Sequence, residues 1–346
     1  MSLDQSPLPQ LEGGLFLTDG GIETTLIFHE GLALPYFAAF DLLKSAEGTA
    51  ALYAYYERYA AMASACGLGF VLESPTWRAS SDWGDKLGYS AAALAAANGK
   101  AIALMARLRD AFAGAGSAMV ISGCVGPRGD GYDPGSGMGA DEAGDYHRAQ
   151  IAAFAQAGAD MVTAITMTNA NEAVGIARAA EAAGLPVAIS FTLETDGRLP
   201  TGQSLAEAIA AVDQATGQGP CYYMINCAHP THFDGVLARA SDRARDRASD
   251  RARDRARDRD WVQRIRGLRA NASRLSHAQL NEARDLDAGD PTEFGGQYRA
   301  LLARHPQINI LGGCCGTDHR HLAAICQALG VAPVEAQGRR AAAARG

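Results

Sequence analysis

The amino-acid sequence predicts an α/β protein that folds as a single (β/α)8 TIM barrel. Short apolar runs alternate with alanine-rich stretches of helical periodicity along most of the 346 residues. This alternation is typical of βαβ units, which build parallel sheets. Eight such units favour a closed barrel over an open sheet, because barrels of this kind take about 250 residues or more.

The eight predicted strands are near-continuous apolar runs, as expected of strands that are covered on both faces. They span residues 15–18, 69–73, 118–124, 160–167, 187–193, 222–227, 265–269 and 308–314. Helical periodicity follows each of the first five strands, over residues 49–66, 91–112, 141–157, 171–183 and 204–215. The barrel is expected to occupy residues 12–330, with flexible tails at 1–11 and 331–346.

An arginine- and aspartate-rich repeat interrupts the predicted barrel at residues 239–260. We interpret it as a solvated extension that is poorly ordered or partly helical. The alternative is an arginine-rich arm for nucleic acid, which the compensating aspartates and the lack of interleaved aromatic residues disfavour. Its position between the sixth helix and the seventh strand predicts that it lies on the amino-terminal face, away from the chemistry.

The overall charge and the chain start point to a soluble enzyme-like protein. A formal net charge of −7 gives no basic field to attract nucleic acid or an anionic membrane. No uninterrupted apolar run is long enough to span a bilayer, and residues 1–11 lack the pattern of a secretory signal. The sequence therefore predicts a cytoplasmic protein with small-molecule partners, and neither nucleic acid nor a membrane among them.

Three cysteines follow the ends of predicted strands. Cys227 ends the sixth strand, and Cys314 and Cys315 follow two glycines at the end of the eighth. Active sites of such barrels lie at the carboxyl ends of strands, where the thiols of strands six and eight can meet. Three thiolates predict one Zn²⁺ per chain with a vacant fourth position. A closed structural zinc site and a metal-free site are the alternatives, but no CxxC pair supplies a fourth thiolate.

An all-thiolate zinc site favours reactions of sulfur over reactions of water. Three negative sulfurs neutralise the ion and make it a weak Lewis acid, whereas a thiol bound to it is deprotonated outright. A free thiol has a pKa of about 8.5, so coordination makes the thiolate available at neutral pH. The expected chemistry is attack of a substrate thiolate on an electrophilic carbon.

These motifs resemble the homocysteine S-methyltransferase family. The resemblance rests on Thr18-Asp19-Gly20-Gly21, Asn226-Cys227 and Gly312-Gly313-Cys314-Cys315-Gly316, and it extends from about residue 14 to residue 329 outside the repeat. It implies a (β/α)8 barrel, zinc held by the three cysteines, and the homocysteine sulfur as fourth ligand. It also implies a substrate pocket formed by Asp19, Gly20, Asn226 and Gly313, in which the Asp19 carboxylate pairs with the substrate ammonium.

The end of the fourth strand departs from the family pattern. Relatives commonly carry a glutamate there that contacts the homocysteine amino group, whereas this chain has Thr166 and no carboxylate nearby. A buried ammonium needs a partner. We expect either Glu73, at the end of the second strand, or Asp19 alone to take that role.

The methyl donor is expected to be an onium compound. Aromatic faces hold such cations, and Trp77 and Trp83 follow the second strand, so they are the candidate donor-binding residues. Residues 126–140 contain six glycines and are expected to form either a lid over the barrel mouth or a plain flexible loop.

The sequence thus predicts a zinc-dependent S-methyltransferase that converts the zinc-bound thiolate of L-homocysteine to methionine. S-methylmethionine and S-adenosylmethionine are favoured over betaine as donors. One alternative is the same chemistry on another small thiol or selenol. The other is a thiol-rich metal-binding or redox-sensing barrel without turnover.

Overall fold

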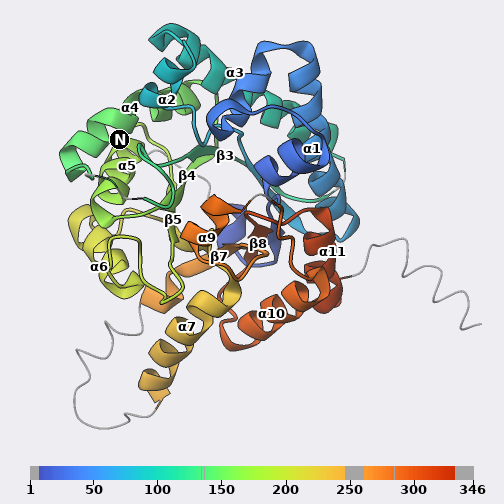
Figure 1. The fold of residues 1–346 in the computed structure, drawn as a ribbon, viewed down its shortest axis with the longest axis vertical. Coiled ribbons are helices and arrows are strands. Elements are labelled where there is room, and N and C mark those ends of the chain that lie inside the picture. The colour runs from blue at the N-terminus through green and yellow to red at the C-terminus, as the bar shows by residue number, and fades with distance from the viewer. Residues whose placement is uncertain are drawn as a thin grey trace, which may run out of the picture.

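The protein is a closed parallel barrel surrounded by helices (Figure 1), as the sequence predicts. The computed structural model describes residues 8–114, 116–133, 135, 137–245, 261–283 and 285–331. The strands follow one another around the barrel in chain order, and the pairing of Phe16 with Ile310 closes it. All connections therefore run from the carboxyl end of one strand back to the amino end of the next.

All eight predicted strands are present, each with ends within two residues of the expected ones. The strands are β1 (Phe16–Leu17), β2 (Gly69–Glu73), β3 (Met119–Val125), β4 (Met161–Met167), β5 (Val187–Thr192), β6 (Tyr222–Asn226), β7 (Ile265–Ala270) and β8 (Ile310–Gly313). The longer helices are α1 (Ala46–Ala65), α3 (Ala91–Ala111), α4 (Ala140–Gln156), α5 (Ala170–Ala182), α6 (Leu205–Thr216), α7 (Pro230–Arg245), α10 (Pro291–Arg304) and α11 (His319–Ala328). Short elements complete the described chain: η1 (Pro9–Leu11), η2 (Thr24–His29), η3 (Pro35–Phe37), η4 (Ala39–Lys44), α2 (Ser81–Lys86) and α9 (His277–Glu282).

Side-chain caps start most of the long helices where the sequence has a serine, asparagine or aspartate. Ser45, Ser90 and Asn169 accept backbone N–H groups at the starts of α1, α3 and α5. Such caps satisfy amide donors that have no partner within the helix. The caps fix the residue at which each helix begins. They thereby fix the length of the loop between strand and helix, and these loops form the barrel mouth.

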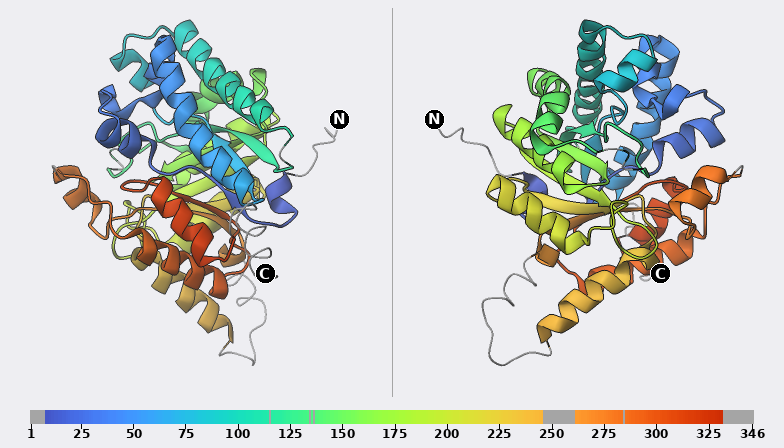
Figure 2. Two further views of the ribbon diagram at one scale, coloured as in Figure 1. Left: turned by 90° about the vertical axis from the view of Figure 1, so that its right-hand side faces the viewer. Right: turned by 60° about the vertical axis from the view of Figure 1, so that its left-hand side comes forward.

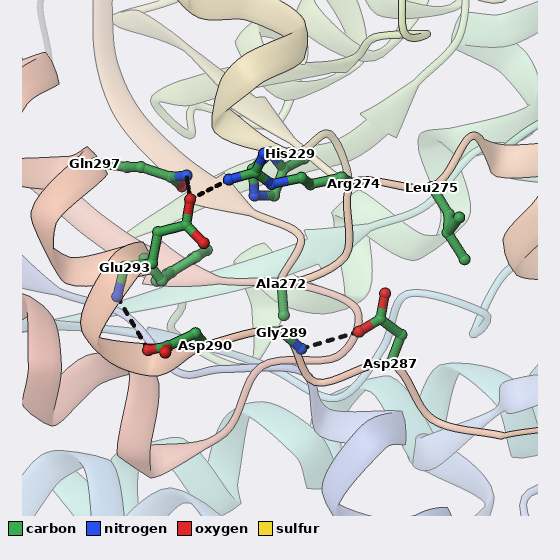
Figure 3. Close-up of a pocket in the computed structure, with 10 residues that line it drawn as sticks. His229, Ala272, Arg274, Leu275, Asp287, Gly289, Asp290, Glu293 and Gln297 are labelled. Atoms are coloured by element: carbon green, nitrogen blue, oxygen red, sulfur yellow. Dashed lines mark hydrogen bonds and ion pairs between the residues drawn. The ribbon is translucent and has the colours of Figure 1, made fainter.

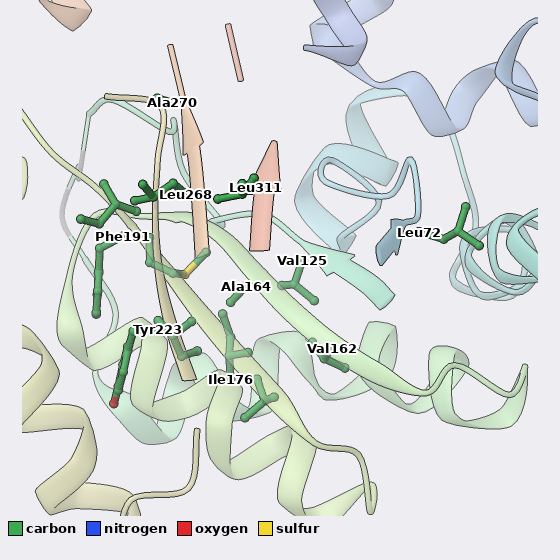
Figure 4. Close-up of a cluster of buried hydrophobic side chains, with 14 of the residues drawn as sticks. Leu72, Val125, Val162, Ala164, Ile176, Phe191, Tyr223, Leu268, Ala270 and Leu311 are labelled. Atoms are coloured by element: carbon green, nitrogen blue, oxygen red, sulfur yellow. The ribbon is translucent and has the colours of Figure 1, made fainter. Parts of the chain in front are cut away.

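Two apolar layers hold the barrel together. Alternate strand residues face inward and outward, so Val71 belongs to the interior cluster while Phe70 and Leu72 belong to the layer beneath the helices. Figure 4 shows part of the outer layer, with Phe191 and Leu268 among its labelled members. Because the interior is filled by side chains near the amino ends of the strands, the open space is left at the carboxyl ends.

Residues 8–11 correct the predicted boundary of the N-terminal tail. Leu8 and Gln10 are buried, and η1 closes the amino end of the barrel. The Gln10 amide donates to Tyr222 Oη at 3.4 Å, and its carbonyl accepts from Asn309 Nδ2 at 2.9 Å. Residues 8–11 read Leu-Pro-Gln-Leu, a segment too short to show an apolar pattern, and their hydrogen-bond partners lie far along the chain. Residues 1–7 and 332–346 lie outside the described residues.

The arginine- and aspartate-rich repeat begins as a continuation of α7. This helix runs through Arg245, and residues 246–260 lie outside the described residues. Since α7 starts just after the carboxyl end of β6, residues 239–245 at its other end lie away from the barrel mouth, and Figure 2 shows the helix projecting from the body of the barrel.

One described helix, α3, is long and apolar enough by length and composition to cross a membrane, although the sequence suggested no such run. In the structure α3 belongs to the outer ring, and Ile102, Met105 and Leu108 on one of its faces are buried in the core. Core helices of soluble proteins commonly have this composition, so the helix by itself does not indicate a membrane span.

Candidate metal centre and acceptor pocket

Three cysteine sulfurs meet at the carboxyl end of the barrel. Cys227 directly follows β6, and Cys314 and Cys315 directly follow β8. All three Sγ atoms lie within 4.8 Å of one another, and those of Cys227 and Cys315 are 4.0 Å apart. Cys227 and Cys314 are joined sulfur to sulfur, with 5.5 Å between their Cα atoms. The structure thus brings together the three thiols that the sequence singled out.

Glycines permit the close packing of the vicinal cysteine turn. A Cβ atom on Gly312 would overlap Thr18 Oγ1, and one on Gly313 would overlap Thr317 Oγ1. Both positions therefore require the absence of a side chain. The Gly313 amide donates to the Asp19 carbonyl at 3.0 Å, which ties the turn after β8 to the segment after β1; a role of Gly313 in shaping the substrate pocket stays a prediction.

Asn226 is buried next to Cys227 and links β6 to β4 and β5 by side-chain hydrogen bonds. Its Oδ1 accepts from the Thr166 amide at 2.9 Å and from Ser190 Oγ at 2.6 Å, while its Nδ2 donates to Thr166 Oγ1 at 2.8 Å. Thr166 and Cys227 both have left-handed backbone conformations, with φ of 66° and 50°. Such conformations cost about 1–3 kcal/mol each in a non-glycine residue and persist where the surroundings impose them. Asn226 supplies that constraint, because it binds Thr166 and directly precedes Cys227.

Asp19 is already paired within the protein. Its Oδ1 lies 2.7 Å from Arg269 Nη1, and its Oδ2 accepts from Tyr55 Oη at 2.8 Å. Arg269 also donates to the carbonyls of Gly20 and Gly313, each at 3.3 Å. Asp19 is thus already engaged by two side chains of the protein, and its pairing with a substrate ammonium stays a prediction. In the structure Asp19 and Gly20 anchor the loop after β1 to β7.

Sequence reasoning missed Arg269 because strand seven was treated as an apolar run. The sequence does carry a signal for it. Arg269 lies two residues after Gly267 on β7, so both residues face the same side of the strand, which is the inner side of the barrel. Burial alone would lower the pKa of Arg269, but the Asp19 and Glu73 carboxylates outweigh it and raise that pKa above its usual value. Arg269 is thus a permanent positive charge at the base of the pocket.

The glycine-rich loop folds over the sulfurs and carries a residue to them. Tyr132 Oη lies 3.1 Å from Cys315 Sγ, and the Tyr132 ring stacks on His277 with centroids 4.0 Å apart. His277 in turn contacts the Cys227 carbonyl through Nε2 at 2.7 Å and Glu194 Oε1 through Nδ1 at 3.0 Å. The sequence predicted a lid or a flexible loop here but singled out neither Tyr132 nor His277. Their roles depend on contacts between segments far apart in the chain.

The family comparison decides the identity at this point. A family model described as homocysteine S-methyltransferase matches residues 16–329. The chain belongs to the homocysteine S-methyltransferase family. It is therefore a methyltransferase enzyme, as the motifs indicated.

Solved structures agree with the barrel fold of this homocysteine S-methyltransferase. The oxidized form of the homocysteine methyltransferase MmuM from Escherichia coli is 21% identical, with a TM-score of 0.66 over 93% of this chain and 99% of that one. The metallated form of MmuM is 20% identical, with a TM-score of 0.66 over 92% of this chain and 99% of that one. No curated protein sequence matches the chain.

Glu73 is the last residue of β2 in this methyltransferase and is almost fully buried, and its predicted contact with the substrate ammonium stays a prediction. It is 3% exposed, and the Ser122 and Thr163 hydroxyls lie within hydrogen-bonding reach. Burial raises the pKa of Glu73 to about 7, although Arg269 and the two hydroxyls oppose that shift. Glu73 Oε2 has no hydrogen-bond partner in the described part of the chain.

The two tryptophans already hold cations that belong to the chain. The Arg78 guanidinium lies between them, 4.0 Å from the Trp77 ring centroid and 3.8 Å from that of Trp83. The Lys86 ammonium is also 3.8 Å from the Trp83 centroid. These contacts argue against the predicted donor role for Trp83. Trp77 lies nearer the mouth, since its Nε1 donates to the Ile165 carbonyl of β4 at 3.2 Å.

A separate pocket of about 200 Å³ lies beside the segments that follow β6 and β7 (Figure 3). Asp287, Asp290 and Glu293 line it, together with His229 and Arg274. Burial lowers the pKa of His229 to about 4, and the neighbouring His232 and Arg274 act in the same direction. None of the three clustered cysteines lines this pocket, so we place the acceptor site at the sulfurs instead.

Proposed function

We propose that this chain transfers a methyl group from an onium donor to the thiolate of L-homocysteine, giving methionine, with one Zn²⁺ ion held by Cys227, Cys314 and Cys315. The convergence of the three sulfurs carries the proposal. S-methylmethionine or S-adenosylmethionine is the favoured donor, ahead of betaine. Membership of the family supports homocysteine methylation; the donor and the zinc are our inference.

The donor atoms of the cluster suit zinc. Zn–S bonds of about 2.3 Å in a tetrahedron separate the sulfurs by roughly 3.8 Å. The Sγ atoms of Cys227 and Cys315 are 4.0 Å apart, close to that separation, and the joined Cys227–Cys314 pair binds the ion once it is reduced to two thiols. Soft thiolate ligands favour zinc over magnesium or calcium. Burial raises the pKa of the Cys315 thiol to about 11, so this thiol stays protonated at neutral pH unless a cation stabilises its anion. When bound, the ion supplies that stabilisation and holds the acceptor sulfur as a thiolate.

The methyl transfer itself depends on how acceptor and donor are oriented rather than on a general acid or base. The acceptor sulfur forms a bond to the methyl carbon, the bond from that carbon to the donor sulfonium breaks, and its electron pair stays on the donor sulfur. A neutral thioether leaves, so no general acid is needed. Asn226 fixes Cys227, the Asp19–Arg269 pair fixes the loop after β1, and Tyr132 covers Cys315 from the loop above. Orientation of this kind supplies most of the rate in such displacements.

The charges around the site favour a cationic donor. Three carboxylates, those of Asp19, Glu23 and Glu73, lie at this end of the barrel. Arg269 is paired with Asp19, so the other two have no ion-pair partner of their own among the described residues. An uncompensated carboxylate lowers the electrostatic energy of a nearby cation. This field supports an onium donor over a neutral or anionic one.

The test is methionine formation by the protein with zinc and homocysteine, with S-methylmethionine, S-adenosylmethionine and glycine betaine tried in parallel. Turnover with a sulfonium and not with betaine is the expected result. Methionine formation at the full rate after zinc removal would contradict the proposal. The absence of a carboxylate at Thr166 makes another small thiol or selenol the second candidate acceptor, so the same assay is repeated with such compounds.

A further inference from the structure

We propose that Glu23 binds the ammonium group of the acceptor amino acid and makes this site selective for α-amino thiols. The inference deepens the proposed function and rests on it. Glu23 had no role in the sequence analysis. It would supply the carboxylate for the ammonium group that is missing at the end of β4, where this chain has Thr166.

The backbone on either side of Glu23 is fixed to the cysteine turn. The Gly21 amide donates to the Thr317 carbonyl at 3.1 Å, and the Gly316 amide donates to Thr24 Oγ1 at 3.0 Å. A Cβ atom on Gly21 would lie 2.6 Å from the Cys314 carbonyl oxygen, so the two segments are in close contact there. Glu23 is therefore held beside the vicinal cysteines, where the acceptor sulfur must come.

Among the described residues, no side chain donates a hydrogen bond to the Glu23 carboxylate. Its one hydrogen-bond donor within the described chain is its own backbone amide. Asp19 by contrast is engaged by Arg269 and Tyr55, and Glu73 lies at the Ser122 and Thr163 hydroxyls inside the barrel. Glu23 is surrounded by protein yet keeps some accessible surface, as expected of a group that lines an open cavity.

The neighbouring arginines do not neutralise Glu23. Arg269 pairs with Asp19, and Arg78 donates to the Gly129 carbonyl at 2.7 Å and lies 3.6 Å from Asp130. Both arginines oppose the effect of burial, which nevertheless raises the pKa of Glu23 to about 7, with Asp19 adding to the rise. A carboxylate in this state is stabilised by an incoming cation. An ammonium group is the cation that an amino-acid thiol carries.

The acceptor carries a thiol at one end and an ammonium at the other, so it can bind at two points. The three sulfurs take the acceptor sulfur, and the carboxylate beside the cysteine turn takes the ammonium at the other end. The charge of Glu23 contributes to the raised pKa values of the Cys315 thiol and the Tyr132 hydroxyl, as expected of a carboxylate near the cysteine turn. An acceptor that lacks the ammonium would leave Glu23 unpaired and would bind less well.

The experiment compares L-homocysteine with 4-mercaptobutyrate, which has the same thiol and carboxylate but no ammonium. Binding to the zinc-loaded full-length protein is measured by calorimetry, and KM and kcat are measured with a working donor. The variant is Glu23→Gln, and Glu30→Gln is the control, since Glu30 is an exposed glutamate of the same segment. Zinc content and unfolding temperature are measured for each protein.

We expect Glu23→Gln to weaken homocysteine binding and raise its KM by about 10- to 100-fold, because a hydrogen bond to a charged group is lost. Binding of 4-mercaptobutyrate and the zinc content should change little, and Glu30→Gln should match the wild type. A Glu23→Gln protein that keeps the wild-type preference for homocysteine would overturn the inference. Equal losses of binding for both acceptors would also overturn it, because they would indicate a structural role. If Glu23→Gln does not fold, the same comparison of the two acceptors is made with Glu23→Asp, which keeps the charge on a shorter side chain.

The two proposals fail in distinguishable ways. Wild-type protein that binds homocysteine in preference to 4-mercaptobutyrate but forms no methionine with any onium donor would contradict the proposed function and leave the role of Glu23 supported. Wild-type protein that makes methionine, with a preference that Glu23→Gln does not reduce, would contradict the inference and leave the proposed function supported. Wild-type protein that binds both acceptors equally would also overturn the inference.

Discussion

Arg269 and Asp19 form an ion pair inside the barrel, with 2.7 Å between Nη1 and Oδ1. Both side chains are almost fully buried, and the pair links the last residues of β7 to the loop after β1. Removing one member of such a pair leaves an uncompensated buried charge, which is strongly destabilising. The pair therefore contributes to the stability of the barrel as well as to the shape of its mouth.

Arg269→Met should lower the free energy of unfolding by about 3–5 kcal/mol. The measurement is urea unfolding followed by circular dichroism. Arg304→Met is the control, because Arg304 pairs with Asp234 at the surface, where such pairs contribute about 0–1 kcal/mol. Equal effects of the two substitutions would show that the buried pair has no special weight.

Cys227→Ala and Cys314→Ala should each abolish zinc binding and methyl transfer together, since each removes one of three ligands. Zinc is measured by elemental analysis of the purified protein and methionine by chromatography. Cys221→Ala is the control, because Cys221 is an exposed cysteine near the opposite end of β6. A zinc-free Cys314→Ala protein with full activity would rule out the mechanism.

Gly131→Ala should impair catalysis by disturbing the loop that carries Tyr132. A Cβ atom on Gly131 would lie 3.0 Å from both Thr166 Cγ2 and Trp77 Cζ2, so the loop must shift. Small displacements of a closing loop reduce rates strongly, and we expect kcat/KM to fall about tenfold or more. Gly129→Ala is the matched control, because its nearest neighbour would be 3.8 Å away. Equal rates for the two variants would indicate that this loop contact is not needed for turnover.

Glu73 should make the protein less stable as the pH rises. Burial raises its pKa from 4.5 to about 7, so the folded state binds a proton more tightly than the unfolded state does. The stabilisation is fully present below pH 4.5 and is lost as the pH rises to about 7. Glu73→Gln should remove this dependence, so its stability relative to wild type should increase across that interval. Parallel stability curves for the two proteins between these pH values would contradict the assignment.

The strands and the clustering of the three cysteines could be predicted because their signals are local. Near-continuous apolar runs such as that of β4 identify strands buried on both faces, and their number predicts a closed barrel. The cysteines at the ends of β6 and β8 then had to share one face, because all carboxyl ends of parallel strands do. No long-range contact had to be known for either step.

The partners of the charged residues could not be predicted in the same way. Asp19 was expected to face a substrate, but Arg269 lies 250 residues further along the chain and meets it only when the barrel closes. Tyr132 reaches Cys315 by the same kind of contact, from a loop whose composition suggested only mobility. Leu8 and Gln10 were assigned to a flexible tail for want of any apolar pattern, and tertiary contacts bury them.

Residue type and position along each strand are enough to predict the barrel, the meeting of three cysteines and the class of reaction. Which carboxylates are paired and which remain free depends on contacts that form only when the barrel closes. A buried charge is governed by the groups that surround it in space, and for Asp19, Glu23 and Glu73 those groups come from separate strands and loops. That difference leaves Glu23 as the group able to receive the acceptor ammonium.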